Sequence, residues 1–285
     1  MISRDEFINK IEALPAFSQT SIKLSAILRK PDFSLSEFEE TISFDPSLTA
    51  NLLRLANSSY FGIPRKINTI KLAINLLGAK RVFEAAIANE LGRILPDMLV
   101  GYGISSREFW KHCAAVAIIS SNIARIHKIT AGEMIFTAGL LHDLGKLVVS
   151  TYLEQNSTQF QDLLDEKMTE IQVEQKILGT DHQEIGYLIS KKWKLPQDIC
   201  EANRWHHNPS KTEDPGLKDF VGIIHVADSL AHTLGLGTDD AELMRSIDPV
   251  VTEWLGIKTP ELEKIASESL DDILELTEIF EEIRR

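Results

Sequence analysis

The residues of this chain that could do chemistry are histidines and aspartates between positions 112 and 228. They include an adjacent His-Asp pair and an adjacent His-His pair. Imidazole and carboxylate ligands suit Mn, Fe, Zn or Ni, and no cysteine is needed to complete such a set. The seven candidate metal ligands are His112, His142, Asp143, His182, His206, His207 and Asp228.

The number of candidate ligands fits two metal ions. If one carboxylate bridges, seven side chains give each ion four protein ligands, and octahedral ions keep positions for water and a phosphate oxygen. Two ions held in this way can stabilise both the attacking and the leaving oxygen of a phosphoester. The set predicts a two-metal phosphohydrolase site. Iron or manganese is favoured, with zinc or nickel as alternatives, because the ligands are histidine and carboxylate without cysteine.

Each candidate also has an ordinary alternative, since a histidine on an apolar helix face is more often a core residue than a ligand. The whole set favours metal, because five of the eight histidines would each need a separate structural role. The other three fit structural roles better. His127 falls near a predicted helix end, where positive charge is favourable. His225 and His232 share a helix face with Asp228, and we expect His225 to be the supporting partner of the ligand set.

The helical pattern directs two of the candidates inward. Apolar residues stand three, four and seven positions after His112, and four before and three after Asp228. A buried carboxylate without a partner is costly, and a metal ion removes that cost. His142 and Asp143 are adjacent, so on a helix they point about 100° apart. Either one ion contacts both from close to the backbone, or Asp143 reaches a second ion.

Helical periodicity dominates the chain and predicts an all-α fold, because clear strand alternation is absent. Helix starts are predicted at Asp45-Pro46 and at three capping boxes, Ser34–Glu37, Ser105–Glu108 and Thr130–Glu133. The best boundary is Gly101-Tyr102-Gly103, since every candidate ligand follows it. We therefore predict a helical region over 1–103, a metal-binding helical region over 104–238 and a C-terminal helical extension over 239–285.

Composition narrows the classes of function. The chain has 285 residues, a net charge of −12 and only two cysteines. The negative charge argues against non-specific binding to nucleic acid or to an anionic membrane. No apolar run has membrane-spanning length, and the first residues do not resemble a signal peptide. Together with the low cysteine count, these features predict a cytoplasmic protein that does not bind membranes.

The order His, His-Asp, His, His-His, Asp resembles the HD superfamily of metal-dependent phosphohydrolases in its binuclear form, and the segment 139–146 is similar to the superfamily signature. Four further segments resemble the HDOD family specifically. This resemblance covers roughly residues 10 to 235. It implies a multi-helix HD-type bundle preceded by an N-terminal helical HDOD subdomain, with a role in signal transduction. The four segments are Leu14–Phe17, Asp45–Ser58, Ile70–Gly78 and Trp193–Pro196.

The resemblance also implies a role for each ligand. One ion would be held by His112, His142, Asp143 and Asp228, and a second ion by His182, His206 and His207. Asp143 would bridge the two ions, and a water between them would attack phosphorus. Lys146 would be the second catalytic residue if its charge meets a phosphate. The alternative is an ordinary solvated lysine.

Two departures from related families bear on activity. Many HDOD proteins lack HD ligands and are regulatory modules, whereas this chain keeps the full set. The HD-GYP family, which hydrolyses cyclic di-GMP, has a Gly-Tyr-Pro motif after its paired histidines, but residues 208–216 here lack it. Some HD-GYP members use a glutamate at the position of Glu108 as an extra ligand. We favour a helix cap for Glu108, because it is also the last residue of the Ser105 capping box.

Two classes of function therefore remain open. The first is a phosphohydrolase that acts on a nucleotide or another phosphorylated small molecule. The second is a regulatory module with signalling-protein partners, in which the metal centre is structural or senses metal, oxygen or redox state.

Overall fold

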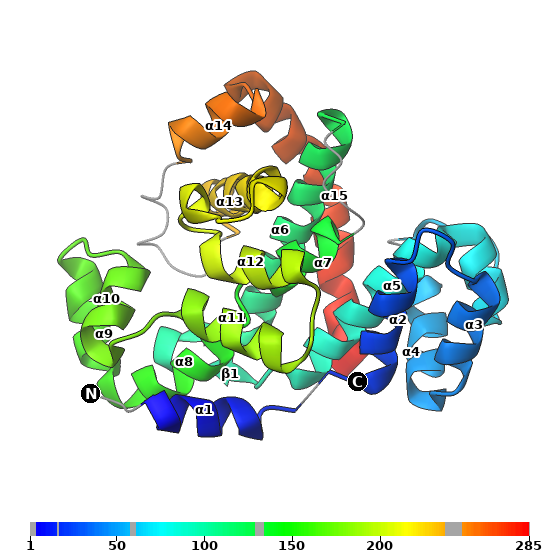
Figure 1. The fold of residues 1–285 in the computed structure, drawn as a ribbon, viewed down its shortest axis with the longest axis horizontal. Helices are drawn as coiled ribbons and strands as arrows, with labels where there is room; N and C mark the ends of the chain where they lie inside the picture. The colour runs from blue at the N-terminus through cyan, green and yellow to red at the C-terminus, as the bar shows by residue number, and fades with distance from the viewer. Residues whose placement is uncertain (1–3, 16, 58–60, 129–133, 237–246, 285) are drawn as a thin grey trace.

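The computed structural model describes residues 4–15, 17–57, 61–128, 134–236 and 247–284, and it is an all-α protein with one small hairpin (Figure 1). This confirms the predicted fold class. The N-terminal third consists of α1 (Arg4–Ala13), α2 (Gln19–Leu28), α3 (Leu35–Ser43), α4 (Pro46–Ala56) and α5 (Ile70–Ile94).

The rest of the chain is a helical bundle followed by two C-terminal helices. A hairpin of β1 (Met98–Leu99) and β2 (Ile104–Ser105), with η2 (Val100–Tyr102) between them, leads into the bundle. The remaining elements are α6 (Ser106–Ile126), α7 (Ile135–Leu141), α8 (Lys146–Leu153), η3 (Glu154–Asn156), α9 (Ser157–Asp165), α10 (Glu170–Leu178), α11 (His182–Lys192), α12 (Gln197–Trp205), η4 (Pro209–Lys211), η5 (Pro215–Leu217), α13 (Lys218–Thr233), α14 (Pro249–Leu255) and α15 (Thr259–Arg284).

Helix α6 is the centre of the bundle, because α7, α13 and α15 all pack against it (Figure 1). Its buried alanines allow close approach of neighbouring helices. A Cβ atom on Gly139 of α7 would lie 2.8 Å from the Cα of Ala117, so only glycine fits there. On another side, the indole of Trp110 donates a hydrogen bond to the carbonyl of Leu276 in α15. These contacts hold α7 and α15 against α6, the helix that carries His112.

The first helix, α1, packs against the bundle and not against the helices that follow it in sequence. Helices α2 to α5 form one group, whereas α1 contacts α8 and α11 of the bundle. The ring of Phe7 lies 4.6 Å from that of Tyr152, and Lys192 donates to the carbonyl of Ile11. The division at residue 103 stays a prediction. At that point the β1–β2 hairpin separates α5 from α6, and the sequence pattern did not predict this hairpin.

Most of the predicted helix starts are observed. Ser105 and Glu108 form a complete capping box, and the Asp45 side chain caps α4. Ser34 caps α3 through the amide of Glu37, without the reciprocal bond. The predicted box at 130–133 lies outside the described residues. In the described part of the chain, no helix is long and apolar enough to cross a membrane.

One carboxyl group on α5 is buried without full charge compensation. Glu84 is 7% exposed and lies beside Phe136 of α7 and Leu276 of α15. Burial raises the pKa of Glu84 to about 7, although the nearby Lys80 and Arg81 act in the opposite direction. Between the ordinary pKa and this one, the folded protein keeps a proton that the unfolded chain releases. The free energy of unfolding therefore falls as pH rises through that interval, because the folded protein binds this proton more tightly than the unfolded chain does.

We expect Glu84→Gln to stabilise the protein more at high pH than at low pH, relative to wild type, because glutamine has no charge to bury. Relative to wild type, the variant should gain up to about 2 kcal/mol of unfolding free energy between about pH 5 and about pH 8. Urea unfolding at the two pH values measures this. Glu40→Gln, at an exposed position of α3, is the control and should show no such difference. An equal effect of Glu84→Gln at both pH values would contradict the argument.

Candidate metal centre

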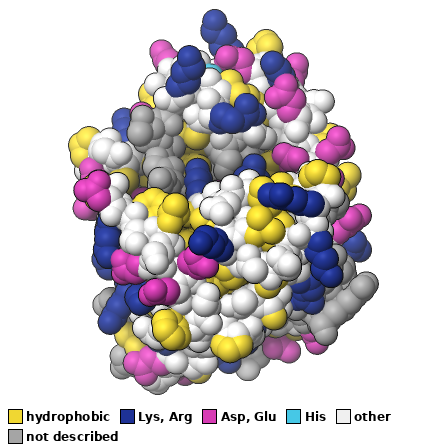
Figure 2. All heavy atoms as spheres, turned by 90° about the vertical axis from the view of Figure 1, so that its right-hand side faces the viewer, with side chains coloured by type: hydrophobic (Ala, Val, Ile, Leu, Met, Phe, Trp, Pro, Cys, Tyr) yellow, Lys and Arg dark blue, Asp and Glu magenta, His cyan; other side chains and the backbone are white. Residues whose placement is uncertain are grey.

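Five elements bring the seven candidate ligands together. His112 lies on α6 and Asp228 on α13, while His182 is the first residue of α11. The His142-Asp143 pair follows the end of α7, and the His206-His207 pair follows the end of α12. All except His207, which is partly exposed, are buried. On the face shown in Figure 2, histidine side chains hardly reach the surface.

The first cluster contains His112, His142 and Asp228. The Nε2 atoms of His112 and His142 are 3.3 Å apart. The Oδ1 atom of Asp228 lies 3.2 Å from Nε2 of His112 and 3.7 Å from Nε2 of His142. The donor atoms of the three residues all lie within 4.8 Å of one another. This spacing suits a single ion.

The second cluster contains Asp143, His182, His206 and His207, again within 4.8 Å. The Oδ1 atom of Asp143 lies 3.5 Å from the Nε2 atoms of His182 and His206. Its other oxygen, Oδ2, lies 3.6 Å from Nε2 of His142 in the first cluster. The carboxylate of Asp143 thus presents one oxygen to each cluster. That is the geometry required of a bridging ligand.

Four of the histidines are held in the orientation that a metal ligand needs. In each ring the Nδ1 atom meets an acceptor: Leu236 O for His112, Gly139 O for His142, the Glu174 carboxylate for His182, and Ala202 O for His206. A proton on Nδ1 leaves the Nε2 lone pair for a metal. All four Nε2 atoms face the two clusters.

The donor atoms fit metal ions better than they fit one another. Two nitrogens bound to the same ion at ~2.1 Å lie about 3 Å apart, which matches the spacing of His112 and His142. Without a proton or an ion, their lone pairs would repel. Among the described residues, Oδ1 of Asp143 and Nε2 of His206 are buried and make no hydrogen bond. Buried polar atoms normally have partners, so these two also point to an ion.

The carboxylates of the centre are ionised even without metal. Burial alone would raise the pKa of Asp143, but Lys146 and His142 hold it well below its usual range. Burial is likewise outweighed at Asp228, whose pKa is held well below its usual range by the neighbouring His112 and His232. Burial lowers the pKa of His142 to about 3, so its imidazole is neutral. Neutral imidazole and ionised carboxylate are the forms that bind divalent ions.

Close packing of backbone places the His142-Asp143 turn against α11. A Cβ atom on Gly145 would lie 1.8 Å from the carbonyl oxygen of His182, and one on Gly186 would lie 2.5 Å from the side-chain oxygen of Asn203. Gly145 therefore requires glycine, because its clash would be with backbone. The signature segment 139–146 thus combines two ligands with the glycine that lets a third ligand approach.

A layer of acidic residues behind the second cluster was not predicted from the sequence. Glu174 of α10 accepts hydrogen bonds from Nδ1 and the backbone amide of His182 and from the hydroxyl of Tyr102. Although burial opposes the charged form, Glu174 raises the pKa of His182 to about 9. The available signal was the four-residue spacing of Glu170 and Glu174, which puts both on one helix face.

Lys146 is not a solvated lysine. Its side chain is 2% exposed, and Nζ lies 3.0 Å from Oδ2 of Asp143 and 2.9 Å from Oε2 of Glu170. It neutralises two buried carboxylates, one of which is the bridging candidate. Its predicted contact with a phosphate stays a prediction.

Glu108, His225 and His232 have structural partners. Glu108 accepts hydrogen bonds from the amide and hydroxyl of Ser105, which confirms the helix cap. His232, rather than His225, contacts the Asp228 carboxylate, at 3.3 Å. His225 supports a different ligand, because its Nδ1 atom bonds to the carbonyl oxygen of His206. Gln183, also not predicted, connects α11 to the backbone of His207.

Comparison with known proteins places the chain in a family. The HDOD domain model matches residues 14–209, so the chain belongs to the HDOD family. An uncharacterised protein of Treponema pallidum is 25% identical over 253 residues. The match covers 84% of this chain and 46% of that protein, so the chain spans about half the length of its curated relative.

Solved structures show the same fold. An HDOD domain protein of unknown function from Geobacter sulfurreducens has a TM-score of 0.75 at 24% identity, covering 98% of this chain and 96% of that one. A protein of Shewanella amazonensis, provisionally assigned as a phosphohydrolase, has a TM-score of 0.74 at 22% identity, with coverage of 96% and 97%. These similarities establish the all-α HDOD fold of the chain.

Removing the carboxylate behind His182 tests the role of the acidic layer. We expect Glu174→Gln to weaken binding of one of two metal ions by about 10- to 100-fold, because His182 loses the charge that orients it and raises its basicity. Competition with a chromophoric chelator measures each affinity. Glu166→Gln, at an exposed position after α9, is the matched control. Unchanged affinity for both ions in Glu174→Gln would show that Glu174 does not support a ligand.

Proposed function

We propose that this HDOD protein binds two divalent transition-metal ions through the seven predicted ligands and hydrolyses a phosphoester. The observation that carries the proposal is the carboxylate of Asp143, which presents one oxygen to each of two compact His and Asp clusters. The Shewanella amazonensis protein named as a phosphohydrolase supports the proposal through its fold alone, since it is only 22% identical to this chain. Iron or manganese is favoured by a ligand set of histidine and carboxylate.

Bound ions would supply a Lewis acid for the phosphate oxygens and would lower the pKa of a water. The chain itself does three things. Asp143 and Asp228 provide the negative charge that offsets the ions, and the Nδ1 contacts hold each imidazole in one orientation. Lys146 fixes the Asp143 carboxylate, so the oxygens stay directed at both clusters. A substrate would approach past His207, the most exposed of the seven.

A regulatory role is the second candidate function. Lys146, whose Nζ atom lies 3.0 Å from Oδ2 of Asp143, already pairs with two carboxylates and is almost fully buried. The charge of this lysine is therefore already balanced by carboxylates of the protein. That observation favours a metal centre that stabilises the fold or senses a signal over one that hydrolyses a substrate. In this role the partners would be signalling proteins.

Metal content is the first test. We expect protein purified from its native source to carry about two transition-metal ions per chain, and Asp143→Ala to lose at least one, because the variant lacks the shared ligand. Elemental analysis gives the count, and circular dichroism should remain helical. Asp219→Ala, at an exposed position of α13, should keep the wild-type count. Both ions retained in Asp143→Ala would refute the bridging assignment.

Hydrolysis separates the two candidate functions. We expect metal-loaded protein to cleave a generic aryl phosphodiester in an Asp143-dependent way, with weak or no turnover of cyclic di-GMP. The reasons are the missing Gly-Tyr-Pro motif and the small amount of positive charge beside the ions. Product release with each substrate, compared between wild type and Asp143→Ala, measures this. Rapid turnover of cyclic di-GMP would contradict the expected selectivity, and no turnover of either substrate by fully loaded protein would favour the regulatory function.

A further inference from the structure

A groove lies between α2 and the turn that connects α11 to α12, and it contains none of the seven metal-ligand candidates. It consists of two hollows of about 390 and 330 Å³, which both have Arg29, the residue after α2, in their lining. Ile22 and Ala26 of α2 line one side of the larger hollow, and Leu195 and Pro196 line the other. The groove therefore has an apolar lining where the N-terminal helices meet the bundle.

The larger hollow is basic, although the chain carries a net charge of −12. Arg29 and Lys194 are exposed cations of its two sides, and no carboxyl group of the described residues lines it. Neither cation forms an ion pair with any residue that the structure describes. The smaller hollow contains Asp198, where burial raises the pKa of the carboxyl group and the charge of Arg29 acts in the opposite direction. The excess positive charge thus lies in the larger hollow, where it can attract a negatively charged surface.

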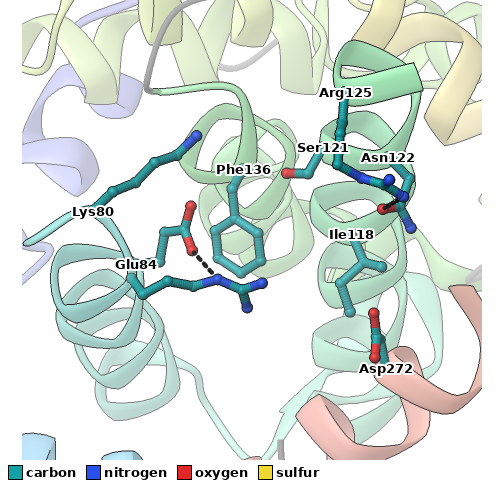
Figure 3. Close-up of a pocket in the computed structure, with 9 residues that line it drawn as sticks. Lys80, Glu84, Ile118, Ser121, Asn122, Arg125, Phe136 and Asp272 are labelled. Atoms are coloured by element: carbon teal, nitrogen blue, oxygen red, sulfur yellow. Dashed lines mark hydrogen bonds and ion pairs between the residues drawn. The ribbon is translucent and has the colours of Figure 1, made fainter. Parts of the chain in front are cut away.

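Another cavity, between α5 and α6, has carboxyl groups among its cations (Figure 3). Nε of Arg81 lies 3.9 Å from Oε2 of Glu84. Carboxyl groups of the chain thus offset part of the positive charge there, which sets this cavity apart from the larger hollow of the groove. The charged residues that line it are Lys80, Arg81, Glu84, Arg125 and Asp272.

Helix α15 presents an exposed face of the opposite charge. Leu270 is 39% exposed and Leu274 is 54% exposed, and they are one helical turn apart on the same face. Asp271 and Glu278, both exposed, lie beside this pair, since they stand three residues before and four residues after Leu274. Asp272 lines the cavity in Figure 3, and each leucine is two residues away from it, so the leucines point to the other side of the helix. This face thus combines two apolar anchors with negative charge.

We propose that these two surfaces bind each other between copies of this chain, so that the acidic face of α15 in one copy lies in the basic groove of another. The two leucines contact the apolar lining of the groove, and the carboxylates beside them approach Arg29 and Lys194. An amphipathic helix laid in an apolar groove is a recurring mode of protein recognition, and opposite charges at the rim fix its orientation.

The contact joins two different surfaces of the chain. Copies can exchange both contacts within a pair or continue head to tail, and in either case one α15 face meets one groove. A single helix in a groove makes a small interface, so we expect a dissociation constant of roughly 10 to 1000 µM. Neither surface contains a metal-ligand candidate, so the association does not depend on the metal centre or on its proposed activity.

Sedimentation velocity of the 285-residue chain tests the contact. We expect its average mass to rise between about 10 and 1000 µM, and to rise less at high salt because the charges are exposed. Arg29→Glu reverses a charge of the groove, and Leu274→Lys replaces an apolar anchor by a cation. Each variant should associate at least roughly tenfold more weakly than wild type. The matched controls, Lys71→Glu on α5 and Val250→Lys at a 57% exposed position of α14, should associate like wild type.

A mixture of the two variants distinguishes this contact from any other self-association. The Arg29→Glu protein keeps its α15 face, and the Leu274→Lys protein keeps its groove, so an equal mixture should form a complex of one copy of each. The proposal is overturned if wild type stays monomeric throughout the range, if either control weakens association as much as the two variants, or if the mixture associates no more strongly than its components. Circular dichroism of each variant confirms that the helices remain.

Discussion

The arrangement of the centre depends on one buried carboxylate, that of Asp143. One of its oxygens faces His142, and the other faces His182 and His206. A charge in the interior of a protein is tolerated only when it is paired, so its surroundings are constrained on every side. Lys146 supplies a permanent partner at 3.0 Å. The imidazoles of His142, His182 and His206 face the remaining lone pairs, which ties the ends of α7, α11 and α12 together.

Lys146 connects Asp143 to the acidic residues of α10, which lie behind the second cluster. Glu170 balances the lysine, and Glu174 binds His182 and accepts from Tyr102 of the η2 turn. Each charged group is therefore matched by one of opposite sign or by a hydrogen-bond donor. Such a network is strong when complete and costly when one member is lost. This explains why the hairpin after α5, distant in sequence from α10, is tied to the centre.

Close backbone contacts make this network geometrically feasible. Gly139 lets α7 lie directly on α6, and Gly145 lets the following turn meet the first residue of α11. A methyl group at either position would collide with backbone that cannot move without shifting a ligand candidate. The helix-end positions of His142 and His206 have a similar effect. There the imidazole can bond to a carbonyl of its own helix while its other nitrogen faces the neighbouring helices.

The sequence by itself determined the helical class and the seven residues that converge, because periodicity and residue chemistry are local properties of the chain. It also indicated the cap at Glu108 and the inward direction of His112 and Asp228. Burial of Lys146, the support from Glu174, and the contact of His232 with Asp228 were decided only by tertiary structure. Each depends on which helix faces a given side chain. A four-residue offset along α13 puts His232 beside Asp228, whereas His225 turns toward the backbone of His206. Pairings between helices distant in sequence have no periodic signal, so only the packed fold reveals them.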